Sequence, residues 1–310
     1  MKKFLLKVFG FILGTMVISF LFELYIGHKL DKGYRYYFQA DWHDLKNHNS
    51  DMLFVGNSRT LEHFDPFFIE HKFGVKAEVL SQEGQHVNFL WLKFKQYLKS
   101  NPPPKEVYLQ SDYFFFEYSK DLFGINNYAT CFFNDRVDLT SLSDVEGYKT
   151  IYRIMPLAAV QFPLFTKVIL EDTVKETFEK HRGYMPKNET FRGDWAHPNT
   201  VKVNPGDKGY TFIDSFMVAC KKQDIRLYFI FSPVSFPSWS VIESKELVKK
   251  EIDKKSGVLQ FPVSYRDYNR ADLYSDIRLF YNHSHLNTEG VSVFMNQFAG
   301  DSLVFLSFRK

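Results

Sequence analysis

The stretch of sequence that decides the fold is Met52-Leu53-Phe54-Val55-Gly56-Asn57-Ser58-Arg59-Thr60. Its first four residues are apolar, as in a strand buried on both faces of a sheet, and Gly56 then marks a tight turn. The residues after this glycine can begin a helix. A buried strand that turns directly into a helix is the opening unit of an α/β domain.

The same pattern, a short apolar run followed by a break, recurs along the chain. Further strands are predicted at 77–80, 106–109, 226–231 and, more weakly, 260–265. Helices are predicted at 66–73, 87–99, 211–223, 242–255 and from 288 to about 304. Strands that alternate with helices form a parallel sheet with right-handed crossovers. We therefore expect an α/β fold with a doubly wound parallel sheet.

The N-terminal segment is almost wholly apolar from Phe4 to Ile26, which is long enough to cross the hydrocarbon layer of a membrane as a helix. Positive charges at its start place the N-terminus in the cytoplasm and the rest of the chain outside, in the periplasm or at the cell surface. Residues 20–25 offer no small-residue cleavage site, which favours a retained signal anchor over a cleaved signal peptide. A buried core helix is the remaining alternative.

These features divide the chain into three parts. Residues 1–27 are predicted to be a cytoplasmic tip and transmembrane anchor, and the polar and aromatic residues 28–49 a tether. The globular domain is expected over residues 50–310, with a long insertion at about 113–207 between the third and fourth strands. Long loops of this kind usually serve a function, so we expect the insertion to cover or line the site.

Composition excludes several classes of protein. The 310 residues carry 39 Lys and Arg against 36 Asp and Glu, and Lys2, Lys3 and Lys7 account for the difference, so no nucleic-acid partner is expected. Cys131 and Cys220 are the only cysteines, too few for a disulfide framework. The spacing of Asp, Glu and His indicates no metal site, and no glycine-rich nucleotide loop is present. We expect neither a metal nor a cofactor.

Three places just after predicted strands carry residues suited to chemistry, and ligands of open parallel sheets bind at this edge. The turn at Gly56 places Ser58 at the start of a helix, where free amides favour negative charge. Gly84 follows the second strand, and its small size lets a backbone amide approach a substrate oxygen. Residues 282–290, Asn-His-Ser-His-Leu-Asn-Thr-Glu-Gly, precede the last helix.

Gly-Asn-Ser-Arg-Thr at 56–60 and His-Leu-Asn-x-x-Gly at 285–290 resemble motifs of the SGNH (GDSL-like) hydrolases. They look most like the membrane-anchored extracytoplasmic branch, with its proteins similar to alginate O-acetyltransferase and to teichoic-acid D-alanyl-transfer factors. The resemblance spans 51 to about 303, except the insertion. It implies a flavodoxin-like sheet, with Ser58 as nucleophile and His285 as general base. The backbone amides of Ser58 and Gly84 would then form part of the oxyanion hole.

The sequence departs from that pattern at two positions. The family has an aspartate three residues before the histidine, whereas this chain has Asn282, which can hold a tautomer but carries no charge. Asp276 is the alternative group to orient the histidine. The family also has an asparagine after the third strand as an oxyanion donor. In this chain Gln110 or Ser111 would have to donate instead.

Several polar residues near these motifs have open roles. Arg59 is a candidate to bind an anionic or sugar substrate, or to form a salt bridge on the helix face. His63, His86 and His283 are rivals to His285 as the base, and His86 is the best of them because it follows the turn at Gly84.

The resemblance and the N-terminal helix together predict an extracytoplasmic serine esterase or O-acyltransferase. It would act on a cell-envelope polysaccharide or another glycoconjugate through a Ser58-acyl intermediate. The membrane and a membrane-bound acyltransferase are its expected partners. The alternative is a catalytically weak or inactive SGNH-like module that binds glycan or serves as a scaffold in a membrane acyl-transfer assembly.

Overall fold

The computed structural model describes residues 1–32, 42, 45–46, 48–111, 115–122, 125–128, 132, 137–138, 145, 182–191, 206–235 and 245–301. The chain divides into two compact units. One unit comprises residues 1–44, 123–138 and 145–178, and the other comprises 45–122, 139–144 and 179–310. The predicted tether and most of the predicted insertion lie outside the described residues, so these two boundaries stay predictions.

The larger unit is built on a five-stranded parallel sheet. Its strands are β1 (Met52–Gly56), β2 (Ala77–Ser81), β3 (Glu106–Gln110), β4 (Arg226–Phe231) and β5 (Ser264–Asp267). They lie in the order β2-β1-β3-β4-β5, and every neighbouring pair is parallel. This order is that of a flavodoxin-like, doubly wound sheet, with its switch point between β1 and β3. The predicted fold class is therefore confirmed.

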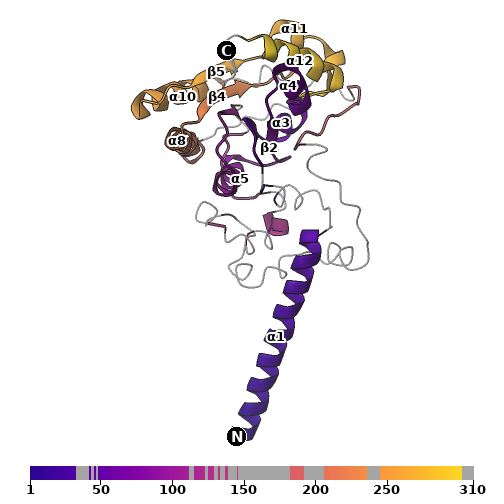
Figure 1. Ribbon diagram of the computed structural model, residues 1–310, viewed down its shortest axis with the longest axis vertical. Helices are drawn as coiled ribbons and strands as arrows, with labels where there is room; N and C mark the ends of the chain where they lie inside the picture. The colour runs from indigo at the N-terminus through magenta and orange to yellow at the C-terminus, as the bar shows by residue number, and fades with distance from the viewer. Residues whose placement is uncertain are drawn as a thin grey trace. The chain divides into compact units, whose positions relative to one another are not determined.

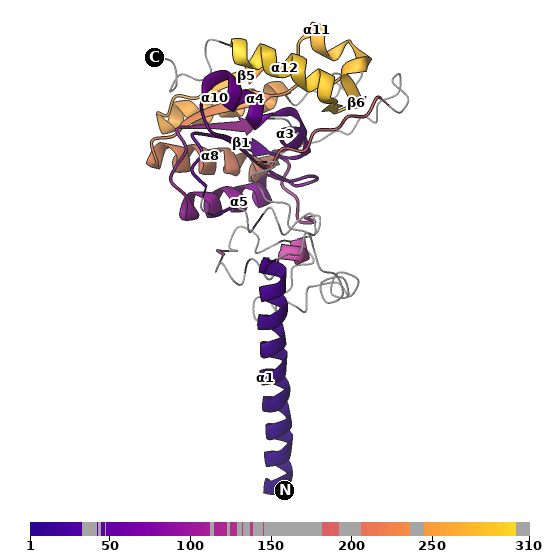
Figure 2. The same cartoon turned by 45° about the vertical axis from the view of Figure 1, so that its right-hand side comes forward.

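Helices cover both faces of this sheet (Figures 1 and 2). On one face α5 (Val87–Ser100), α8 (Gly206–Lys222) and α10 (Lys245–Leu259) pack side by side. On the other face α12 (Thr288–Gly300) contacts α3 (Ser58–His63), α4 (Pro66–Phe73) and α11 (Ala271–Tyr274).

Aromatic side chains fill the core between the sheet and α12. Tyr108 of β3 stacks on Tyr228 of β4 with ring centroids 4.7 Å apart. Phe298 of α12 meets Phe54 of β1 at 5.8 Å and Tyr108 at 5.5 Å, both edge to face. Such pairs add to the large apolar area that each ring buries. The last helix is thereby fixed over β1 and β3, and with it the segment that leads into it.

Several elements differ from those predicted. The helix α8 begins at Gly206 rather than at 211, and α10 ends at Leu259 rather than at 255. The fifth strand begins at Ser264 rather than at 260, because α10 continues to Leu259 and ends in a left-handed residue, Gln260, with φ of 48°. The amide of Phe261 then donates to the Ser256 carbonyl at 3.2 Å, which is a Schellman helix end. The structure also has an antiparallel hairpin that was not predicted. It consists of β6 (Phe280–Asn282) and β7 (His285–Leu286) and follows the short 3₁₀ turn η7 (Ile277–Leu279).

The smaller unit contains the N-terminal helix α1 (Lys2–Lys32). Its segment Lys2–Phe22 is long and apolar enough to cross a membrane. A signal sequence has the same length and composition, so the choice of a retained anchor stays a prediction. Elsewhere in this unit Trp42 packs edge to face on Phe132 at 5.0 Å, near η1 (Ile125–Tyr128).

Gly56, the last residue of β1, lies where the neighbouring side chains leave no space for a Cβ atom. A Cβ atom at this position would lie 1.9 Å from Thr60 Oγ1 and 2.6 Å from Gln110 Oε1. These two atoms are themselves joined, because the Thr60 hydroxyl donates a hydrogen bond to the Gln110 side chain. The start of α3 is therefore pressed directly against the ends of β1 and β3.

Replacement of Gly56 by alanine should lower the free energy of unfolding by about 1–3 kcal/mol, because α3 must shift away from β3 to admit the methyl group. Chemical denaturation measures this loss. Gly257→Ala in α10 is the matched control, since nothing lies within 4 Å of its added Cβ. It should stabilise the helix by about 0.5–1 kcal/mol. Equal losses in both variants would contradict the close approach at Gly56.

Candidate active site

Ser58 is the first residue of α3 and follows directly on the turn after β1. Asn57 caps the helix, and its side-chain oxygen accepts a hydrogen bond from the Arg59 amide at 3.2 Å. The helical bonding begins with the Leu61 amide, which donates to the Asn57 carbonyl at 3.0 Å. The Ser58 amide precedes that bond and so has no partner within the helix. Ser58 thus stands at the carboxyl edge of the sheet, beside the switch point.

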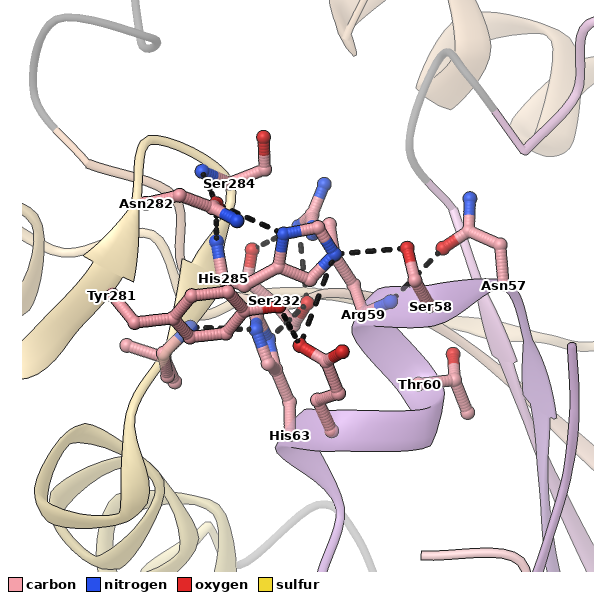
Figure 3. Close-up of polar contacts among 12 residues, drawn as sticks. Asn57, Ser58, Arg59, Thr60, His63, Ser232, Tyr281, Asn282, Ser284 and His285 are labelled. Atoms are coloured by element: carbon pink, nitrogen blue, oxygen red, sulfur yellow. Dashed lines mark hydrogen bonds and ion pairs between the residues drawn. The ribbon is translucent and has the colours of Figure 1, made fainter. Parts of the chain in front are cut away.

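His285 of β7 reaches Ser58 across 227 positions of sequence. Figure 3 shows the imidazole between Ser58 on one side and Asn282 on the other. The distance from His285 Nε2 to Ser58 Oγ is 2.8 Å, and that from Nδ1 to Asn282 Oδ1 is 2.9 Å. The structure therefore brings together three residues that the sequence singled out.

Asn282 fixes the tautomer of this imidazole. Its Oδ1 atom accepts hydrogen bonds from the backbone amides of Ser284 at 2.9 Å and His285 at 3.0 Å, so the oxygen must face the ring. Because that oxygen can only accept, His285 Nδ1 must carry the proton and donate it. The lone pair of Nε2 then points at Ser58 and can accept the hydroxyl proton.

The charge state of His285 suits a base. Burial lowers the pKa of His285 to about 3, with further lowering from the positive charges of Arg59 and Lys187. The ring is consequently neutral at neutral pH and free to take a proton. The same surroundings oppose the imidazolium that forms when it does so, and the neutral Asn282 amide offers no compensating charge.

His63, a predicted rival base, is fully buried and has both ring nitrogens in use. Its Nε2 atom accepts the Leu286 amide at 2.9 Å, so its Nδ1 atom carries the proton that is donated to Ser232 Oγ at 3.1 Å. Burial, and then Arg59, hold the pKa of His63 well below its usual value, which keeps the ring neutral. His63 therefore positions β7 and leaves no lone pair for Ser58.

The other two rival histidines have their contacts elsewhere. His86 is the residue that precedes α5, and its Nδ1 atom lies 3.8 Å from Glu117 Oε2. The ring of His283 packs on Phe191 at 5.1 Å, while its carbonyl accepts hydrogen bonds from the amide and hydroxyl of Ser235. Ser235 lies in the segment that follows β4, and this segment therefore holds the turn of the β6–β7 hairpin.

Arg59 is buried beneath the site rather than extended into solvent. Its guanidinium donates to the Ser232 carbonyl and, at 3.0 Å, to Ser232 Oγ, and it lies 4.9 Å from the centre of the Phe231 ring. Ser232 thus receives hydrogen bonds from both Arg59 and His63 and joins α3 to the end of β4. Sequence reasoning missed this role of Ser232. Substrate binding by Arg59 stays a prediction.

The predicted oxyanion donors lie at the same edge of the sheet. Gly84 has a left-handed backbone with φ of 66° in the turn after β2. Gln110 ends β3, and its side-chain oxygen accepts from Thr60, while Ser111 is fully buried and its amide donates to the Ile230 carbonyl at 2.8 Å. The hydrogen bonds named here join Gln110 and Ser111 to residues other than Ser58, so the oxyanion hole stays a prediction.

Of the two candidate groups to orient the histidine, Asn282 contacts His285. Asp276 instead caps η7, where its carboxylate accepts the guanidinium of Arg278 at 2.6 and 2.9 Å. The hydrogen bonds from Arg278 lower the pKa of Asp276.

Glu62 is a site residue that sequence reasoning missed. It is 1% exposed, accepts the Tyr281 hydroxyl at 2.5 Å, and places Oε2 4.0 Å from His285 Nε2. Burial raises its pKa to about 7, although the Tyr281 hydrogen bond works in the opposite direction. The signal in the sequence was its position one helical turn after Ser58, which puts both side chains on one face of α3.

The described residues contain no group of three or more His, Cys, Asp or Glu side chains placed to share a metal ion. Two ionisable side chains of this region, His285 and Glu62, instead contact the hydroxyls of Ser58 and of the partly buried Tyr281. This arrangement can take a proton from Ser58 and return it to a leaving group.

No protein-family model matches the sequence, and no curated protein matches it. Among solved structures, that of a "putative acylhydrolase" from Bacteroides fragilis is similar, with a TM-score of 0.37 and 11% identity over 82% of this chain and 88% of that chain.

Asn282→Asp should raise the pKa of His285 by about one unit or more, because a carboxylate at Nδ1 favours the imidazolium while it keeps the same backbone hydrogen bonds. NMR titration of the ring protons measures the change. Asp276→Asn is the matched control and should leave the pKa of His285 unaltered. The opposite pattern would show that Asp276 is the group that orients the histidine.

Proposed function

We propose that the chain is an extracytoplasmic serine esterase or O-acyltransferase that works through a Ser58-acyl intermediate. The observation that carries this proposal is the 2.8 Å contact between Ser58 Oγ and the unprotonated Nε2 atom of His285. A serine hydroxyl is a poor nucleophile until a base takes its proton, and a neutral imidazole held at this distance is such a base.

In the first step the Ser58 proton passes to His285 Nε2 as Oγ bonds to the acyl carbon of an ester. The bond from that carbon to the alcohol oxygen breaks, and the proton on Nε2 goes to the departing alcohol. In the second step water or a sugar hydroxyl gives its proton to His285 and attacks the acyl group. Ser58 leaves with that proton. Hydrolysis and transfer differ only in the second nucleophile.

The proposed substrate is a cell-envelope polysaccharide or another glycoconjugate. Support comes from α1, whose length and composition suit a membrane span, and from the lysines near its start, which favour an extracytoplasmic domain. A membrane-bound acyltransferase that passes acyl groups outward is the proposed partner. The resemblance of the two sequence motifs to the membrane-anchored SGNH branch supports the same assignment.

One observation favours a second candidate, a catalytically weak or inactive SGNH-like module that binds glycan or serves as a scaffold in a membrane acyl-transfer assembly. Asn282 stands where a carboxylate would stabilise the imidazolium, and an amide carries no charge. A site with this defect can keep its shape and its ligand while it loses turnover.

A fluorophosphonate probe, which phosphonylates activated serines, should label the full-length chain at Ser58. Ser58→Ala should abolish labelling, and His285→Ala should slow it by about 10²- to 10⁴-fold because the base is removed. Mass spectrometry identifies the labelled residue. Ser215→Ala, on the surface of α8, is the matched control and should label at the normal rate.

Absence of labelling in the folded wild-type chain would count against serine chemistry. The scaffold candidate then makes its own prediction in cells that carry the protein. Acylation of the envelope should persist in Ser58→Ala and His285→Ala and should be lost when residues 1–27 are removed.

A further inference from the structure

Glu62 is a buried acid that the proposed chemistry has not yet used. The Tyr281 hydroxyl donates to its Oε2 atom at 2.5 Å, and the same oxygen lies 4.0 Å from His285 Nε2. Ser58 and Glu62 therefore approach the same nitrogen of one imidazole, and both come from the six-residue helix α3.

Tyr281 holds this arrangement from the other side. Its ring stacks on His285, with centroids 5.5 Å apart and planes at 27° (Figure 3). Burial and the neighbouring Glu62 carboxyl raise the pKa of Tyr281, so its hydroxyl keeps the proton that it donates. Because Asn282 follows Tyr281 directly, two adjacent residues of β6 contact the His285 ring, one at Nδ1 and one on its face.

The proposed reaction needs negative charge beside the His285 ring, to stabilise the imidazolium that forms there. His285 becomes an imidazolium when it takes the Ser58 proton, and Arg59 and Lys187 both disfavour that cation. At Nδ1 the ring meets only the neutral amide of Asn282. An ionised carboxylate at 4.0 Å in a low-dielectric site attracts a cation far more strongly than it would in water.

We propose that ionised Glu62 supplies, from the Nε2 side of His285, the negative charge that Asn282 lacks on the Nδ1 side. This role rests on the proposed serine chemistry. Glu62 acts through His285, so it is a positioning residue rather than a catalytic one. The Tyr281 hydroxyl holds its carboxylate in place.

The role predicts a dependence on pH. Several elements contribute charged or titratable groups that face Glu62 or His285. These groups are Arg59, His63, Glu83, Tyr184, Lys187 and Tyr281. With its pKa at about 7, Glu62 loses its charge as the pH falls through neutrality, and the support of the imidazolium is lost with it. His285, with its pKa at about 3, takes up its own proton in a separate and much lower range.

The rate of fluorophosphonate labelling at Ser58, measured on the full-length chain from pH 5.5 to 9, tests this role. In the wild type the second-order rate constant should fall about tenfold or more as the pH drops through about 7. Glu62→Gln should remove this step and hold the rate at the low-pH level of the wild type. The two proteins should therefore agree near pH 5.5 and differ about tenfold or more above pH 8.

Two further variants separate this role from a loss of stability. Tyr281→Phe keeps the stacked ring but removes the donor that lowers the pKa of Glu62, so the step should move to higher pH. Glu106→Gln is the matched control: Glu106 is another buried glutamate that accepts tyrosine hydroxyls, from Tyr108 and Tyr228, but it lies at the amino end of β3. Its pH profile should be that of the wild type, whatever its stability.

Parallel pH profiles in the wild type and Glu62→Gln would overturn the role of Glu62 while leaving the chemistry of Ser58 intact. Should Glu62→Gln not fold, a step that stays at the same pH in Tyr281→Phe would overturn it equally. Absence of labelling in the wild type is a different result, because it removes the serine chemistry itself and the role of Glu62 with it.

Discussion

The hydrogen bond from the Leu286 amide to His63 Nε2 is the constraint on which the site depends. It joins α3 to β7 across 223 positions of sequence and fixes the backbone next to His285. The bond exists only while His63 Nε2 is unprotonated, and burial secures this by lowering the pKa of His63. The other nitrogen of the ring holds Ser232 at the end of β4. His63, whose ring nitrogens bond to Leu286 and Ser232 rather than to Ser58, thus helps to set the geometry of the Ser58–His285 contact.

Much of the fold could be predicted from the sequence because most strands of a parallel sheet are buried on both faces and appear as short apolar runs. β1 and β4 are such runs, ended by Gly56 and Pro233. β5 (Ser264–Asp267) is an edge strand that is partly exposed and mostly polar, and its first residue was predicted too early in the sequence, at 260. The β6–β7 hairpin has strands of three and two residues, too short to show any period.

The site was predictable to a similar degree. Motif and order singled out Ser58, His285 and Asn282, and the structure places these three residues in contact, while their catalytic roles stay predictions. The buried positions of Glu62 and His63 were not predicted, because an ionisable residue on a short helix usually faces solvent. The hairpin supplies a partner to each of them, and no local pattern reveals a partner more than 200 positions away.

The place of His285 in the chain has a consequence for the order of events during synthesis. All five strands of the sheet are complete by Asp267, whereas the imidazole arrives later, on β7. A chain that folds from its N-terminus can therefore close the sheet and set Ser58 in position while no base is present. On the proposed chemistry, Ser58 is an ordinary alcohol until the hairpin docks. On that chemistry, Ser58 gains its nucleophilic power only after the strands of the sheet are complete.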